Sequence, residues 1–86
     1  MEIFVGNLPP QVNTSQLIAL FQQYGTVIAG RIITDKFSGL SRGFGFVIMP
    51  ERDEALSAIT AVSGKEFHGN KLNAGAALTQ SRMRNI

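Results

Sequence analysis

Residues 42–49, Arg-Gly-Phe-Gly-Phe-Val-Ile-Met, predict a β-strand with two unlike faces, because alternate side chains of a strand share a face. One face carries Arg42, Phe44, Phe46 and Ile48, and the other carries Gly43, Gly45, Val47 and Met49. Phenylalanine is usually interior, so the alternation alone favours a core position for Phe44 and Phe46. Arg42 shares their face, however, and a charge is rarely buried without a partner. Glycines alternate on the opposite face, where they let a helix approach a sheet closely. These two observations favour a buried glycine face and a phenylalanine face open to solvent.

A shorter stretch, residues 2–5, repeats the pattern, with Glu2 and Phe4 on one side and Ile3 and Val5 on the other. Both strands are explained by a sheet that packs one face on helices and leaves the other face wet. The wet face would then carry three large aromatic side chains, those of Phe4, Phe44 and Phe46. Exposed aromatic patches usually mark binding surfaces. Aromatic rings beside cations suit single-stranded nucleic acids, whose bases stack and whose phosphates need countercharge.

Residues 13–25 carry the signals of a first helix. Asn13 followed three residues later by Gln16 predicts a capping box at its start. Gly25 is expected to end it as a left-handed residue. The apolar residues between them recur at helical spacing and predict a buried stripe: Leu17, Leu20, Phe21 and Tyr24. A second strand is expected over residues 27–34, followed by a turn that contains Ser38-Gly39.

The second helix is expected to run from Glu51 to Gly64, because Pro50 ends the preceding strand and acidic residues fill the next turn. Carboxylates in a first turn suit the helix dipole. Its buried stripe consists of Ala55, Ala58, Ile59 and Val62. The small alanines are expected to pack closely over the underside of the sheet, at Gly43 and Gly45.

Residues 66–70 are typical of a short hairpin, and residues 71–74 complete the pattern as the last strand, with Lys71 and Asn73 facing outward. The order is strand, helix, strand, strand, helix, strand, which is the split βαβ arrangement. Two right-handed crossovers would place both helices on one face. The predicted fold class is therefore α+β: a ferredoxin-like βαββαβ sandwich with a four-stranded antiparallel sheet and two helices on one face.

Residues 42–49 resemble the longer ribonucleoprotein motif of the RNA recognition motif (RRM) family, K/R-G-F/Y-G/A-F-V-x-F/Y. Only Met49 departs from it, and by alternation Met49 faces the core. Residues 3–8, Ile-Phe-Val-Gly-Asn-Leu, resemble the shorter motif of the same family. The chain is similar to the small single-domain RNA-binding proteins of bacteria. The resemblance implies one RRM domain over residues 1–78, a C-terminal tail over residues 79–86, and two motif strands side by side at the centre of the sheet.

The resemblance also implies which residues contact RNA. Phe4 and Phe44 would each lie under a base, and Phe46 would pack against sugars or between nucleotides. Arg42 would engage phosphate or stack, and Ile33 would join the wet face. Solvated loop charge is the alternative for both Lys36 and Arg42, and a frayed terminus is the alternative for the tail. The other implied contacts are Arg31, Lys36, Lys71, Asn73, Gln80 and Arg82.

Composition sets mild bounds on partners. The chain has 86 residues, a formal net charge of +2 and no cysteine. This charge permits nucleic-acid binding without requiring it, and the absence of cysteine excludes disulfides and thiolate metal sites. No apolar run reaches the length of a membrane span. We expect a cytoplasmic monomer, nuclear if the chain is eukaryotic, that binds single-stranded RNA, with single-stranded DNA as a further ligand, and needs no cofactor or metal.

Two other functions are compatible with this topology. Acylphosphatase-like enzymes hold phosphate in a loop with an arginine after the first strand, but here the loop is Asn-Leu-Pro-Pro-Gln. The single histidine, His68, has no predicted partner for catalysis or metal binding, so we predict no enzyme activity. Some RRM relatives bind proteins instead, although those usually lose the exposed aromatics. A protein partner on the helix face, at Leu56, is compatible with RNA binding.

Overall fold

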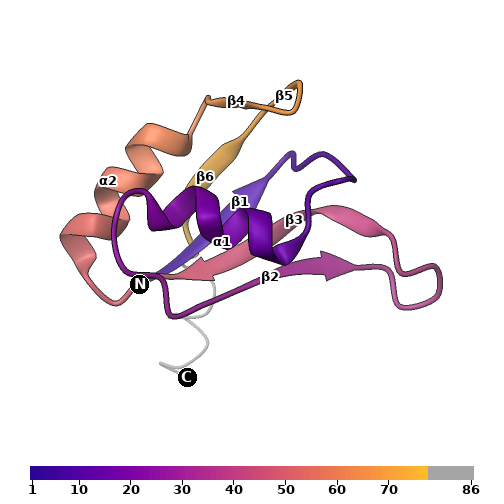
Figure 1. The fold of residues 1–86 in the computed structure, drawn as a ribbon, viewed down its shortest axis with the longest axis horizontal. Coiled ribbons are helices and arrows are strands. Elements are labelled where there is room, and N and C mark those ends of the chain that lie inside the picture. The colour runs from indigo at the N-terminus through magenta and orange to yellow at the C-terminus, as the bar shows by residue number, and fades with distance from the viewer. Residues whose placement is uncertain (78–86) are drawn as a thin grey trace.

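The computed structural model of the protein describes residues 1–77, which form two helices, a four-stranded sheet and a small hairpin (Figure 1). The Gln80 and Arg82 predictions lie outside these residues. In chain order the elements are β1 (Glu2–Gly6), α1 (Thr14–Gln22), β2 (Ala29–Thr34), β3 (Ser41–Ile48), α2 (Arg52–Val62), β4 (Glu66–Phe67), β5 (Asn70–Lys71) and β6 (Asn73–Ala76).

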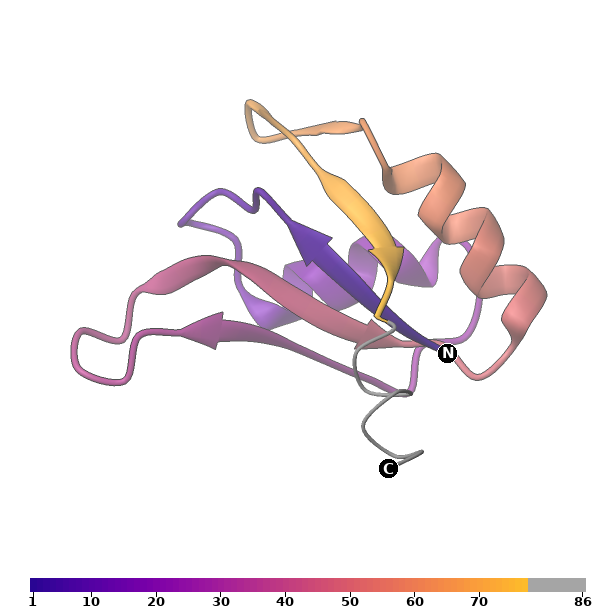
Figure 2. The same cartoon turned by 180° about the vertical axis from the view of Figure 1, so that it is seen from behind.

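The large sheet has the strand order β2-β3-β1-β6, and every neighbouring pair is antiparallel. Both helices lie on one face of it, as Figure 1 shows from the helix side and Figure 2 from the open side. The predicted fold class is confirmed, and β1 and β3 are the two central strands. The face away from the helices is called the outer face below.

Helix α1 begins as its sequence predicts. The Asn13 side chain accepts a hydrogen bond from the backbone N–H of Gln16 at 2.8 Å, and the Gln16 side chain accepts one from the Asn13 N–H at 2.9 Å. The prediction for its end is wrong: α1 ends at Gln22, and Gly25 has a φ of 158°, far from the left-handed helical value. Gly25 instead lies against Glu54, whose carboxylate accepts the Thr26 N–H at 2.9 Å.

The core lies between the sheet and the two helices. The buried residues of α1 are Leu17, Leu20 and Phe21, as the helical spacing predicts, and Tyr24 is partly buried against them. The strands contribute the side chains on the face of the sheet that does not carry the phenylalanines. Of these, Ile3, Val5, Val47 and Met49 are all fully buried. Met49 therefore faces the core, so the replacement of the motif's aromatic residue by methionine at this position does not change the outer face.

The helix that covers the β3 glycines differs from the expectation. A Cβ built on Gly45 would meet Leu17 of α1, which packs on β2 and β3, whereas α2 packs on β6. The alanine stripe is nevertheless buried at Ala55 and Ala58. Helical periodicity identifies the buried face of a helix but does not say which strands that face covers, which is why the prediction failed.

The segment after α2 also differs from the expectation. Residues 66–71 form the two-stranded β4-β5 hairpin, whose turn residues His68 and Gly69 have φ values of 51° and 92°. The last strand of the large sheet begins only at Asn73. Lys71 therefore belongs to the hairpin and not to the sheet. The strand after α1 is likewise shorter than expected, since β2 begins at Ala29.

Candidate nucleic-acid interface

The strand register arranges the outer face in rows that run across the sheet. Residues paired across antiparallel strands share a face, so each row can be followed from strand to strand. The first row is Ala29, Ile48 and Glu2; the second is Arg31, Phe46, Phe4 and Gly75; the third is Phe44, Gly6 and Asn73.

Three phenylalanine rings form one cluster in the second and third rows. The Phe4 ring centroid lies 5.8 Å from that of Phe44 and 5.8 Å from that of Phe46, and the latter two are 6.4 Å apart. Phe4 and Phe44 are inclined by only 32°, whereas Phe46 meets both edge-on, at 67° and 90°. Phe4 is 36% exposed, and the other two are partly exposed. The cluster thus offers two neighbouring ring faces to solvent.

Gly6 explains how the Phe4 ring lies flat. A Cβ built on Gly6 would come within 2.9 Å of the Phe4 ring and 3.8 Å of the Asn73 Cβ. The ring therefore occupies the space that a side chain at this position would take. The short motif combines an aromatic residue with the small neighbour that lets its ring lie across the strand.

Arg31 supplies a cation at the β2 side of the cluster. Its guanidinium carbon is 5.8 Å from the centre of the Phe46 ring, within the range of a cation–π contact, and the residue is exposed. The guanidinium therefore lies beside the aromatic cluster, where it can reach a bound anion without leaving the sheet.

An irregularity in the β2-β3 pairing interrupts the strand alternation near Arg42. The β2-β3 register jumps from Ile32 opposite Gly45 to Thr34 opposite Ser41, and Gly43 has a φ of 87°. Residues on the two sides of such an irregularity need not keep the period of two. The alternation rule therefore does not place Arg42, which is exposed, or Ile33, which is partly buried, on the phenylalanine face.

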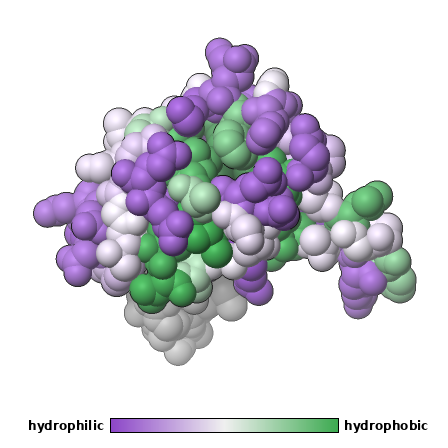
Figure 3. Space-filling model, in the orientation of Figure 1, coloured by the Kyte–Doolittle hydropathy of each residue, from purple (hydrophilic) through white to green (hydrophobic). Residues whose placement is uncertain are grey.

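The β2-β3 loop presents an aromatic residue that the sequence argument missed. Phe37 is 91% exposed, and the Lys36 ammonium is 5.7 Å from its ring centre. The loop projects beyond the body of the molecule, with hydrophobic atoms at its end (Figure 3). Strand and helix periodicities do not apply inside a turn. The only sequence signal for an exposed Phe37 was an aromatic residue within an otherwise polar segment.

Asp35 holds this loop in shape. Its carboxylate accepts the Ser38 N–H at 3.0 Å and the Phe37 N–H at 2.8 Å, and these two bonds lower the pKa of the carboxyl group. The Gly39 N–H donates to the Asp35 carbonyl at 2.7 Å. The loop is therefore organised by its own hydrogen bonds and keeps both Lys36 and Phe37 exposed.

The remaining polar candidates lie near the C-terminal end of β1. Asn73 is exposed in β6 opposite Gly6, in the same row as Phe44. Lys71 is exposed but sits in β5, where its carbonyl accepts the Asn7 side-chain N–H at 2.7 Å. Lys71 thus lies beside the sheet, because the last strand starts later than the sequence suggests.

The described residues form neither a metal site nor a membrane-spanning helix. Within residues 1–77 there is no group of three or more histidine, cysteine and acidic side chains that could hold a metal ion. His68 packs its ring 4.5 Å from that of Phe67 in the hairpin. No helix of the described chain is long and apolar enough to cross a membrane.

Comparison with known proteins gives one consistent family. The family model described as "RNA recognition motif" matches residues 3–73. The chain is 40% identical over 80 residues to the chloroplastic 28 kDa ribonucleoprotein of Spinacia oleracea, covering 93% of this chain but only 34% of that protein. It is 43% identical over 77 residues to RbpA of Nostoc sp., covering 90% of this chain and 76% of RbpA.

The fold also matches solved structures. The crystal structure of RNA Binding Protein PG1 superposes with a TM-score of 0.88 at 47% sequence identity, covering 91% of this chain and 94% of that one. The chain spans about a third of the length of the spinach protein, whereas it spans most of RbpA and PG1.

Proposed function

The chain belongs to the RNA recognition motif family, and from this premise we propose that it binds single-stranded RNA on the outer face of its sheet. One observation supports this proposal above the others: three phenylalanine rings gather on the face that the helices leave open. Members of the family are binding proteins, and this chain is accordingly a binding protein and not an enzyme. The spinach relative is named a ribonucleoprotein, and PG1 an RNA-binding protein.

In this proposal the bases stack on Phe4 and Phe44, whose rings are the two closest to a common plane. Phe46 meets them edge-on and packs against sugars or between two nucleotides. Each base stacked on an aromatic ring contributes about 1–3 kcal/mol. Every base has a flat face, so the stacking itself tolerates different sequences and admits single-stranded DNA as well.

Cations around the cluster hold the phosphates. Arg31 is adjacent to Phe46, and the loop residue Lys36 and the exposed Arg42 extend the positive charge along β2 and β3. The acidic residues Asp53 and Glu54 lie in the first turn of α2, on the opposite face of the sheet. The outer face is thus more positive than the net charge suggests. Further proposed contacts are Ile33, Lys71, Asn73, Gln80 and Arg82.

The proposal also covers the oligomeric state, a protein partner and the cellular location. We expect a monomer with a domain over residues 1–78, and a protein partner, if one binds, on the helix face at Leu56, which is 42% exposed. We expect a cytoplasmic location, although the spinach relative is chloroplastic by name.

An NMR titration of isotope-labelled protein with a pool of short random single-stranded RNAs at low salt tests the proposal. We expect chemical-shift changes at Phe4, Phe44, Phe46 and Arg31, because these residues share the second and third rows of the outer face. Changes confined to α1 and α2, or no changes, would contradict RNA binding on the sheet and favour a protein partner.

The exposed ring of Phe37 is expected to contribute a further stacking contact as RNA passes the β2-β3 loop. Replacing it, Phe37→Ala, should weaken RNA binding about 5- to 10-fold, the lower part of the range for one stacked base, because a loop holds its side chain less firmly. Stability should not change, since the ring is 91% exposed. Fluorescence anisotropy measures the Kd. Leu40→Ala, 68% exposed in the same loop, is the control, and equal effects of the two variants would rule out stacking.

A further inference from the structure

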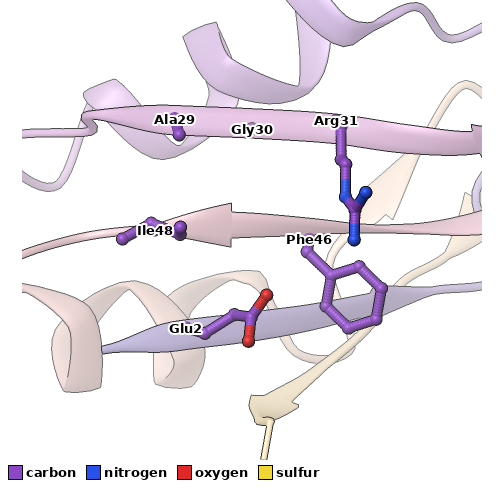
Figure 4. A pocket seen from close by; sticks show the side chains of 6 residues that line it. All are labelled: Glu2, Ala29, Gly30, Arg31, Phe46 and Ile48. Carbon is purple, nitrogen blue, oxygen red and sulfur yellow. The ribbon is translucent and has the colours of Figure 1, made fainter. Parts of the chain in front are cut away.

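A hollow of about 80 Å³ opens on the outer face beside the aromatic cluster (Figure 4). This volume is several times the roughly 10–15 Å³ that one water molecule requires. The hollow exists because the β2 side of the first row ends in the short methyl group of Ala29. Its lining consists of Glu2, Ala29, Gly30, Arg31, Phe46 and Ile48.

The hollow has an apolar floor and two oppositely charged walls. Ile48 and Phe46 of β3 form the floor, one residue in each of two adjacent rows. Glu2 stands on the β1 side, directly opposite Ile48, and Arg31 stands on the β2 side, directly opposite Phe46. Figure 4 shows the carboxylate and the guanidinium approaching from these two strands, over the strand between them.

A carboxylate in this position restricts what the hollow can accept. Glu2 would repel a phosphate, so the hollow does not continue the line of phosphate-binding cations. A carboxylate is an acceptor only and favours a group that presents N–H donors. The floor of Phe46 and Ile48 favours a flat, largely apolar ring. Together these features match the ring and edge of a nucleobase.

We propose that this hollow selects guanine in the bound RNA through Glu2, an inference that rests on the proposed RNA binding. Guanine carries two adjacent N–H donors, at N1 and N2, and a carboxylate accepts two parallel hydrogen bonds. Cytosine and adenine present one amino group next to an acceptor nitrogen, and uracil presents one N–H between two carbonyl oxygens. These three bases offer Glu2 at most one donor and place a repelling acceptor beside it.

Short oligouridines that carry a single central A, C, G or U test the proposal. The uridines on both sides let the protein choose the register that brings the central base into the hollow. By anisotropy at fixed ionic strength, the wild-type protein should bind the guanine oligomer about 5- to 20-fold more tightly than the other three, the lower part of the range for a bidentate base contact. Inosine, which lacks the N2 amino group, should lose much of this preference, and 7-deazaguanine, which retains the N1–N2 edge, should keep it.

The matched pair of variants is Glu2→Gln and Glu66→Gln, the second an exposed acid of the β4-β5 hairpin. Glu2→Gln should bring the ratio of the guanine and uridine Kd values close to one, and Glu66→Gln should preserve the ratio. If RNA binds through the phenylalanines but guanine is not preferred, or Glu2→Gln keeps the preference, this inference fails and the proposed function stands. If no oligomer binds, or binding does not depend on Phe4 and Phe44, both fail.

Discussion

Replacing both stacking rings, Phe4→Ala/Phe44→Ala, is expected to weaken binding of short single-stranded RNA by at least about 30-fold. Two stacked bases at about 1–3 kcal/mol each give about 2–6 kcal/mol, or about 30-fold to more than 10⁴-fold in Kd. The effects of the two changes should not simply add, because the ring centroids are only 5.8 Å apart. Anisotropy with fluorescent RNA at constant salt measures the loss.

The fold should survive the double substitution, because neither ring belongs to the buried core. Some stability will be lost with the aromatic contacts, which contribute about 0.5–1.5 kcal/mol each. Circular dichroism and thermal unfolding therefore accompany the binding measurement. A second variant, Phe4→Leu/Phe44→Leu, retains the apolar bulk and removes the flat rings, so it separates stacking from packing.

Leu56→Ala on α2 is the matched control, since Leu56 is a large exposed hydrophobic residue on the opposite side of the molecule. It should leave the Kd within about 2-fold of wild type, as expected for a residue outside the interface. A folded double alanine variant that still binds RNA as tightly as the Leu56 variant would show that the phenylalanine cluster is not the RNA platform.

The buried and exposed faces of the central strands β1 and β3 could be predicted from the sequence, because every second side chain along each strand points into the core. Ile3, Val47 and Met49 lie in the core where the pattern puts them, and Phe4 lies on the open face. The charge of Arg42 and the glycines opposite the phenylalanines settled the choice of face in the sequence argument. That β1 and β3 are neighbours came from the family resemblance, since alternation says nothing about which strands pair.

The features that alternation cannot predict lie where the regular two-residue period of a strand breaks down or does not apply. At Gly43 the backbone takes a positive φ and the register shifts, so the period of two does not reach Arg42. Phe37 lies in a turn, where no period applies. The hollow between Glu2 and Arg31 depends on the register of β1 and β2, which do not pair with each other because β3 lies between them. Because residues of three strands line the hollow, the pattern of any single strand could not have predicted it.

The glycines of β3 should respond to substitution through two different causes. Gly43 has a φ of 87°, which side chains rarely tolerate, whereas Gly45 is required for space. A Cβ built on Gly45 would collide with the Arg31 carbonyl of β2 and lie 3.2 Å from both the Ile32 Cα and the Leu17 side chain. Two of these three neighbours are backbone atoms of the paired strand, which cannot move aside without opening the β2-β3 pairing at Ile32.

Gly45→Ala is therefore expected to destabilise the domain by about 2–3 kcal/mol, in the upper part of the usual range for overpacking. For a domain of this size this corresponds to a fall in Tm of about 10–20 °C. Gly75→Ala is the matched control, because Gly75 lies in β6 of the same sheet and a Cβ there meets nothing within 4 Å. That variant should stay within about 0.5 kcal/mol of wild type.

Chemical denaturation of both variants gives the free energies of unfolding. Equal stabilities for Gly45→Ala and Gly75→Ala would mean that α1 and β2 can move away from β3 at little cost, and that close packing does not explain the glycine. RNA binding measured well below the Tm provides a second criterion. If Gly45 only maintains the spacing of the sheet, the folded fraction of Gly45→Ala should still bind RNA, because Gly45 lies on the face opposite the phenylalanine rings.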